Sequence, residues 1–296
     1  NNKLYNTACL IVNKRILGFA AKQHLPNYGL FYEDRWFHRW PAGLRDEVKV
    51  GDFQYPIGDL IFDLSGIRIG FEICEDAWVA QRPGRLHFDR GVDILLNPSA
   101  SPFAFQKFMT RERLVIDGSR SFSCSYVYTN LLGNEAGRLL FDGDAMIASD
   151  GTLLASSPRF GYADYYITSA VIDTDVTRLS HSQIKSPVPG GNWKVTDTFQ
   201  WHEVAPAYQT AELEPFERGG YLKEEEFARA VSLALFDYLR KSRSSGFTVS
   251  LSGGADSCAC VALCGLMIRL ADESIGLAAF KEKLGYIKKI QGETTV

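Results

Sequence analysis

One six-residue segment, Ser252-Gly253-Gly254-Ala255-Asp256-Ser257, constrains the fold of this 296-residue chain more than any other. It follows an apolar, β-branched run at residues 247–251 and precedes a helix-like run of small residues at 258–270. A strand that turns through two glycines into a helix directs backbone N–H groups and a helix N-terminus at one point. The pattern therefore predicts a strand–loop–helix unit that binds phosphate. A plain glycine turn between a strand and a helix is the alternative.

The common phosphate loop has four residues between its glycines, followed by Gly-Lys-Ser/Thr, and this segment does not fit it. Ser-Gly-Gly-x-Asp-Ser resembles instead the loop of the ATP pyrophosphatases, which cleave ATP to AMP and pyrophosphate. The resemblance implies that Ser252, Gly253, Gly254 and Ser257 hold the pyrophosphate portion of ATP. Asp256 is anionic, so either it binds Mg²⁺ beside the phosphates or it caps the helix. We favour the metal.

A second group of residues lies in the first third of the chain. Residues 66–78 read Gly-Ile-Arg-Ile-Gly-Phe-Glu-Ile-Cys-Glu-Asp-Ala-Trp, an apolar strand that runs directly into Cys74. A cysteine at a sharp strand end can be exposed and reactive, whereas one within a strand is usually inert core. This segment alone leaves both interpretations open.

Two further segments favour catalysis. Residues 22–37 contain Lys22, a Leu-Pro pair, a tyrosine and Glu33, and residues 97–102 read Asn-Pro-Ser-Ala-Ser-Pro. Together with the Cys74 segment they resemble the nitrilase, or carbon–nitrogen hydrolase, superfamily. The resemblance implies that Cys74 is the nucleophile, that Lys22 stabilises the tetrahedral intermediate and that Glu33 is an accessory glutamate. Such a set suits amide cleavage, because a thiolate attacks better than water and a cation stabilises the oxyanion. In isolation, Lys22 would be interpreted as a solvated surface residue.

The general base is where this sequence departs from the superfamily. In the superfamily a glutamate well upstream of the lysine takes the thiol proton, but no glutamate or aspartate precedes Lys22 here. The chain also opens at Asn1 without a methionine. We therefore expect a truncated chain whose amidase site is incomplete.

The same resemblance implies a glutamine pocket. Tyr28 and Trp78 fall where family members line it, and Ser101 and Lys107 fall where they contact the α-amino and α-carboxylate end of glutamine. A basic residue suits a carboxylate. Core packing is the alternative for the two aromatic residues, and a solvated basic helix face is the alternative for Lys107.

The periodicity divides the chain into two domains and a linker. Residues 1–173 alternate strands, turns and helices, which predicts an α/β domain; the resemblance makes it a nitrilase-like αββα sandwich lacking its N-terminal part. Residues 174–220, with several prolines and paired glycines, predict an extended linker. Residues 221–296 then begin a doubly wound ATP-pyrophosphatase domain that lacks its C-terminal part. The expected strands are 7–12, 67–73, 93–97, 125–130, 144–148, 165–172 and 247–251, with a hairpin turn at 149–151 and helices at 105–121 and 223–241.

Composition excludes several classes of function. The net charge is −3 without a basic block, so we expect no nucleic-acid or membrane partner, and no apolar run is long enough for a membrane span. Six scattered cysteines without a Cys-x-x-Cys pair favour a cytoplasmic protein. Those at 258, 260 and 264 are expected to be buried thiols that pack the helix.

A nitrilase-like domain followed by a Ser-Gly-Gly-x-Asp-Ser domain resembles the family of glutamine-dependent NAD synthetases. The resemblance implies that Cys74 releases ammonia from glutamine and that the ammonia passes through an internal tunnel to amidate ATP-adenylated deamido-NAD. It also implies Mg²⁺, a homo-oligomer, and deamido-NAD and adenine contacts beyond Val296. The alternatives are a stand-alone carbon–nitrogen hydrolase, another ATP-pyrophosphatase amidotransferase, and a truncated chain that catalyses nothing.

Overall fold

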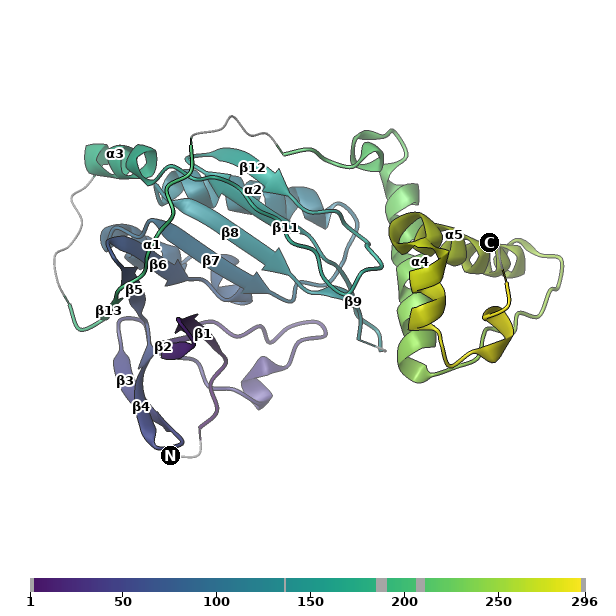
Figure 1. Cartoon of the computed structure of the whole chain (residues 1–296), viewed down its shortest axis with the longest axis horizontal. Coiled ribbons are helices and arrows are strands. Elements are labelled where there is room, and N and C mark those ends of the chain that lie inside the picture. Colours follow the sequence, from purple (N-terminus) through teal and green to yellow (C-terminus); the bar gives the residue numbers. More distant parts are fainter. Residues whose placement is uncertain (1–2, 136, 185–190, 206–210, 294–296) are drawn as a thin grey trace.

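The computed structural model describes residues 3–135, 137–184, 191–205 and 211–293. Figure 1 shows a larger body of strands and helices, with the helical pair α4 (Leu222–Ser242) and α5 (Ala255–Lys283) at one end. Within these residues, no helix is both long enough and apolar enough to cross a membrane.

The first sheet has four strands in the order β1-β2-β4-β3. A tight turn joins β1 to β2, and its residues Asn13 and Lys14 both have positive φ (50° and 64°), as a type I′ hairpin turn requires. β2 and β4 are parallel, and the other pairs in this sheet are antiparallel. The strands are β1 (Thr7–Val12), β2 (Arg15–Ala21), β3 (Arg45–Val50) and β4 (Phe53–Gly58).

The second sheet has seven strands in the order β12-β11-β8-β7-β6-β5-β13. Its central strands β6, β7 and β8 run parallel to one another. The crossover connections that this requires are η2 (Cys74–Ala77) with α1 (Pro83–Asp89) between β6 and β7, and α2 (Lys107–Ser121) between β7 and β8. The carboxyl ends of β6, β7 and β8 therefore meet at one edge of the sheet. The strands are β5 (Ile61–Leu64), β6 (Ile67–Phe71), β7 (Ile94–Ser99), β8 (Ser125–Asn130), β11 (Ala145–Ser149), β12 (Thr152–Ser156) and β13 (Lys194–Asp197), with a short pair β9 (Leu132–Asn134) and β10 (Leu140–Asp142) beside them.

Two apolar cores hold the layers together. Between the sheets, Ala20 of β2 packs with Phe62 of β5. On the other face of the seven-stranded sheet, Val115 of α2 packs with Leu95 and Tyr126, and all three are fully buried. Burying each such side chain contributes about 1.5–3 kcal/mol. The predicted α/β, nitrilase-like fold class is confirmed, and the described residues supply three of its layers: two sheets and the helices of one face.

Most predicted elements are found, and one predicted strand of this body is wrong. β1 and β8 have the predicted bounds, and β11 and β12 form a hairpin in which Asp150 and Gly151 have the positive φ of a type I′ turn. Residues 165–172 belong to no strand of the described chain. Tyr165 and Ile167 are 74% and 85% exposed, so their alternation of apolar residues does not face a core.

The region expected to be an extended linker contains regular structure. It includes α3 (Thr174–Ile184) and β13, which pairs in parallel with β5 at the edge of the seven-stranded sheet. A four-residue edge strand has too short a periodic pattern to be recognised from sequence. Part of the 174–220 region is therefore built into the first domain's sheet.

The C-terminal part is helical. α4 (Leu222–Ser242) confirms the predicted helix, and η3 (Pro215–Arg218) precedes it. α5 (Ala255–Lys283) packs on α4 and is interrupted at Gly276, where φ is 77°. A short η4 (Lys288–Ile290) follows.

Two expectations for this part are wrong. Residues 247–251 form no strand, because a strand needs a neighbour for its backbone groups and no described segment pairs with them. Cys258 and Cys260 are exposed and Cys264 is half-buried, so these thiols do not pack in a core. The first turns of α5 are largely exposed in the described chain.

Candidate active site

Cys74 lies at a sharp turn after β6. It is the first residue of η2 and has a φ of +50°, in the left-handed region that non-glycine residues rarely adopt. Such a conformation costs about 1–3 kcal/mol and is concentrated at functional sites. The residue is half-buried, so it is not enclosed in the core. The sequence left open whether this cysteine sits within a strand, and the structure places it beyond the strand end.

Lys22 follows the last residue of β2 and is 1% exposed. Its Nζ donates a hydrogen bond of 2.5 Å to Oε2 of Glu33, the first residue of η1 (Glu33–Arg35). A buried ammonium needs a paired carboxylate, because desolvation of the isolated charge is costly. Lys22 is therefore not a solvated surface residue, and its contact with Glu33 matches the spacing that suggested the pair.

Asp76 connects the lysine segment to the cysteine segment. Its buried Oδ1 accepts hydrogen bonds from the backbone N–H groups of Gln23 (3.1 Å) and His24 (2.8 Å), the two residues after Lys22. Its Oδ2 accepts one from the N–H of Ile73 (3.0 Å), the residue before Cys74. One carboxylate thus holds the two chain segments that carry the candidate catalytic residues.

Tyr28 stands beside the residue that follows Cys74. Its hydroxyl donates to Oε2 of Glu75 at 3.0 Å, and the residue is 60% exposed. Partial burial, with the neighbouring Glu75 and Cys74, raises the pKa of Tyr28 to about 12. The exposure of the residue argues against core packing, and Tyr28 remains protonated at neutral pH as a hydrogen-bond donor.

Lys107 and Trp78 lie close to each other. Lys107 Nζ is 6.0 Å from the centre of the Trp78 ring and donates to the backbone oxygen of Pro102 at 3.1 Å. Burial, followed by the nearby Arg111, lowers the pKa of Lys107, while Asp142 and the Cys74 thiol act in the opposite direction. Lys107 is therefore half-buried beside the site rather than part of a fully solvated face.

Ser101 is buried and its backbone is held on both sides. Its N–H donates to Oδ1 of Asn130 (2.8 Å), and its carbonyl oxygen accepts from Nη2 of Arg111 (2.7 Å). The contacts fix the loop between β7 and α2 at the carboxyl edge of the sheet.

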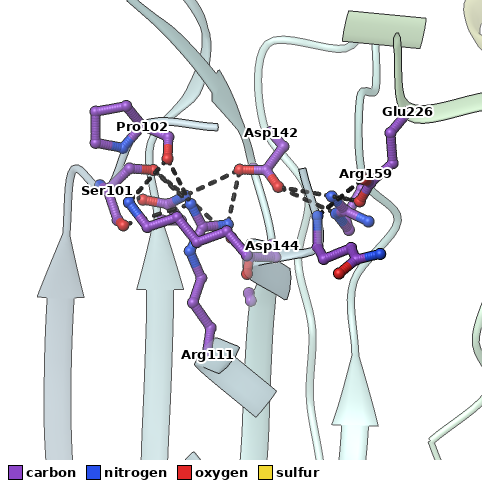
Figure 2. Close-up of polar contacts among 12 residues, drawn as sticks. Ser101, Pro102, Arg111, Asp142, Asp144, Arg159 and Glu226 are labelled. Carbon is purple, nitrogen blue, oxygen red and sulfur yellow. Dashed lines mark hydrogen bonds and ion pairs between the residues drawn. The ribbon is translucent and has the colours of Figure 1, made fainter. Parts of the chain in front are cut away.

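A buried ion-pair network supports this loop (Figure 2). Arg111 donates to Asp142 (2.8 Å) and Asp144 (3.0 Å), and none of the three side chains is exposed to solvent. Asp142 also binds Arg159, which in turn binds Glu226 of α4. Burial, together with Asp142, raises the pKa of Asp144 against the lowering effect of Arg111. The two arginines are needed here because more than one carboxylate shares the site.

Sequence reasoning missed four residues of this site: Glu75, Asp76, Arg111 and Tyr128. The first two follow Cys74 directly, so their acidity next to a candidate nucleophile was the available signal. The Tyr128 hydroxyl is buried and makes no hydrogen bond within the described residues. Burial and then Asp144 raise its pKa, with Cys74 contributing in the same direction, which puts Tyr128 within electrostatic reach of the thiol.

The Ser-Gly-Gly-Ala-Asp-Ser loop forms the N-terminal end of α5. Gly253 has a φ of +82°, and Gly254 is the residue before the first helical turn. The Ser252 hydroxyl accepts from the N–H of Gly254 at 3.4 Å and lies 3.3 Å from the Ser257 hydroxyl. This is an open loop at a helix N-terminus, a position that favours anions in general.

Asp256 is exposed in the first turn of α5, where a carboxylate interacts favourably with the helix dipole. Within the described residues, no group of three or more His, Cys, Asp or Glu side chains gathers in a way that could hold a metal ion. The described residues therefore form no protein cage of three or more such ligands around Asp256, whereas Mg²⁺ is commonly held by only one or two protein carboxylates.

A cysteine at a strained strand end, a buried lysine–glutamate pair and two packed sheets agree with the nitrilase-like fold expected from the sequence. The profile of the carbon–nitrogen hydrolase family matches residues 1–181, and the chain belongs to that family.

The chain is also similar to larger proteins. It is 32% identical over 285 residues to the human glutamine-dependent NAD(+) synthetase and 31% identical over 281 residues to that of Mus musculus, matching 88% and 87% of this chain. It spans only 39% and 37% of the length of those two proteins. The crystal structure of a glutamine-dependent NAD(+) synthetase from Cytophaga hutchinsonii superposes with a TM-score of 0.73 and 39% identity over 95% of this chain and 39% of that one.

Proposed function

We propose that this chain carries the glutamine-hydrolysing part and the ATP-binding loop of a glutamine-dependent NAD synthetase. The observation that carries the proposal is the Asp76 bridge, which ties the backbone next to the buried Lys22–Glu33 pair to the backbone next to Cys74. The Ser-Gly-Gly-Ala-Asp-Ser loop on the same chain and the similarity to NAD synthetases over most of its length support the second half of the proposal.

The first reaction is glutamine hydrolysis at Cys74. The sulfur attacks the side-chain carboxamide carbon as its proton passes to a carboxylate, and the carbonyl electron pair moves to oxygen, where Lys22 stabilises the oxyanion. The carboxylic acid so formed then gives the proton to the nitrogen, the intermediate collapses with cleavage of the C–N bond, and ammonia leaves. Water then cleaves the thioester to give glutamate and the free thiol. The resemblance places the general base before Lys22, where this chain has no acidic residue, so we assign no residue to that step.

In this proposal, four side chains bind glutamine. Tyr28 and Trp78 line the pocket, and Ser101 and Lys107 take the α-amino and α-carboxylate end. The half-buried ammonium of Lys107 supports this role, because a partly desolvated cation binds a carboxylate more strongly than a solvated one.

The second reaction uses ATP and deamido-NAD. The nicotinate carboxylate of deamido-NAD attacks the α-phosphorus of ATP and releases pyrophosphate, and ammonia then displaces AMP to form the amide of NAD. Ser252, Gly253, Gly254 and Ser257 would cradle the pyrophosphate. Asp256 would reach it through Mg²⁺, which neutralises the repulsion between carboxylate and phosphate.

Three further parts of the proposal come from the family resemblance and from composition. The homo-oligomer and the internal ammonia path are expected from the resemblance. A cytoplasmic location is favoured by the cysteines, since all six are free thiols and Cys9, Cys258 and Cys260 are exposed.

Covalent labelling tests the glutaminase half. A glutamine analogue with a diazoketone in place of the carboxamide should alkylate Cys74, and mass spectrometry of the digested protein should find the adduct there. Cys9 is also exposed and serves as the internal control for simple accessibility. Alkylation of Cys9 or another cysteine in preference to Cys74 would refute the assignment.

ATP dependence separates the proposal from a stand-alone amidase. In the natural full-length chain that carries these residues, Ser257→Ala should lower NAD formation by at least about tenfold through loss of a phosphate contact, while glutamine hydrolysis persists. Equal NAD formation by the variant and the wild type would argue against the loop as an ATP site.

A further inference from the structure

The turn that precedes α2 depends on a residue of α4. Gln106 caps α2 with a φ of +60°, a left-handed conformation that is disfavoured for a residue with a Cβ. Its backbone N–H donates a 3.0 Å hydrogen bond to Oε2 of Glu226, which lies 120 residues further along the chain. Lys107, the next residue after Gln106, starts the helix. The direction in which Lys107 leaves the turn is thus tied to α4.

The other carboxylate oxygen of Glu226 is also occupied. Oε1 accepts from Nη2 of Arg159 at 2.9 Å, and both side chains are almost completely buried (Figure 2). Arg159 is itself held by Asp142 at 3.0 Å and by Glu217 at 2.9 Å. These carboxylates hold the Arg159 guanidinium in place. The Glu226 carboxylate therefore cannot rotate away from Gln106 without breaking its buried contact with Arg159.

The contacts close into a ring that passes through Lys107. Asp142 binds Arg111, and Arg111 Nη2 donates to the backbone oxygens of Ser101 and Pro102. The oxygen of Pro102 also accepts from Lys107 Nζ. The ring therefore starts and ends at Lys107, and it includes Ser101, the other residue assigned to this end of glutamine.

We propose that Glu226 is a positioning residue for glutamine binding: by holding the N–H of Gln106, it fixes the first turn of α2 and thereby sets the Lys107 ammonium at the α-carboxylate of glutamine. Glu226 does not itself touch the substrate. The inference rests on the proposed function, and specifically on the role given there to Lys107.

Glu226→Gln in the natural full-length chain tests this role. A glutamine amide has one acceptor oxygen, and the cationic Arg159 takes it, so the amide NH₂ is left facing the N–H of Gln106. We expect KM for glutamine to rise about tenfold with little change in kcat, because an interaction that holds the ground state and the transition state alike is weakened. Glu224→Gln is the matched control, since Glu224 is an exposed residue of the same helix; its KM should equal that of the wild type.

A second substrate separates positioning from a general loss of structure. 4-Aminobutanamide is glutamine without its α-carboxylate, so Lys107 has nothing to bind. Glu226→Gln should leave kcat/KM for this substrate unchanged while lowering kcat/KM for glutamine about tenfold. An equal loss for both substrates, or an unchanged KM for glutamine, would overturn the proposal.

Three outcomes are distinguished. If Glu226→Gln does not fold, as judged by thermal unfolding, Glu226→Asp decides by the same pair of substrates, because it keeps the charge but withdraws the carboxylate by one methylene. If the wild type hydrolyses neither substrate, the proposed glutaminase function fails and the positioning role fails with it. If the wild type hydrolyses glutamine and the variants keep its KM, only the positioning role fails.

Discussion

At the scale of single residues, Asp76 accepts hydrogen bonds from three backbone N–H groups at the candidate active site. Its two oxygens accept from Gln23, His24 and Ile73, and Oδ1 also lies 3.1 Å from Nδ1 of His24. A carboxylate is suited to this position because it only accepts, with two oxygens directed at two different segments. The side chain that follows Cys74 by two residues thereby determines where Lys22 lies relative to the thiol.

Asp76→Asn should separate these two segments. The amide NH₂ meets a backbone N–H on one side, so one buried donor loses its acceptor, at a cost of about 1–3 kcal/mol in the free energy of unfolding. The rate of Cys74 alkylation by the diazoketone analogue should fall at least about tenfold, because a small displacement of a catalytic group is costly. Asp34→Asn, at an exposed pair with Arg39, is the control and should change neither quantity. An unchanged alkylation rate in Asp76→Asn would show that the bridge has no part in the chemistry.

At the scale of elements, the sequence predicts strands and helices whose periodic patterns are long, and it misses contacts between distant segments. α4 shows a full helical pattern with acidic residues at its start and basic residues at its end, and it is confirmed. β13 is a four-residue edge strand, and its pairing with β5 has no local signal. The Cys74 turn was only half predicted, because the pattern marks the apolar strand but not the positive φ that ends it. Gln23 lies 53 residues from Asp76, and Gln106 lies 120 residues from Glu226, beyond any local pattern.

The docking of α4 on β9 shows such a distant contact. Asp237 Oδ2 accepts from the N–H of Asn134 at 2.7 Å, and a Cβ built on the adjacent Gly133 would lie 2.3 Å from the same oxygen. Gly133 also has a φ of +94°. Gly133→Ala should therefore lower the free energy of unfolding by about 2 kcal/mol or more, through backbone strain and the clash. Chemical denaturation measures it, with Gly137→Ala as the control because a Cβ there meets nothing within 4 Å. Equal stability of the two variants would mean that α4 is not held closely at this point.

At the scale of the whole molecule, buried charge joins the parts of the fold. Arg159 precedes the 174–220 region, and it binds Asp142 of β10, Glu217 of η3 and Glu226 of α4. The two arginines of this network face four carboxylates, and burial raises the pKa of both Asp144 and Glu217 despite those arginines. Removing one member would leave uncompensated charge at a junction between the sheet and α4. Such a junction favours cooperative unfolding of α4 with the sheet.

Acid stability of the whole chain should depend on His87, which is buried against the seven-stranded sheet. Its Nε2 donates to the Phe71 oxygen at 3.0 Å, and burial lowers its pKa even though Asp59 acts in the opposite direction. The unfolded chain takes up a proton near the ordinary histidine pKa of about 6.5 while the folded chain does not, so stability falls as the pH drops below that value, by at most about 1.4 kcal/mol per pH unit.

His87→Gln removes this proton uptake. Denaturant titration at pH 7.5, 6.0 and 5.0 measures the free energy of unfolding of both proteins. As the pH falls, the wild type should therefore lose more of this free energy than His87→Gln does. His202→Gln, at an exposed position, should follow the wild type at every pH; a pH-independent difference for His87→Gln would show that His87 is protonated equally in the folded and unfolded chain.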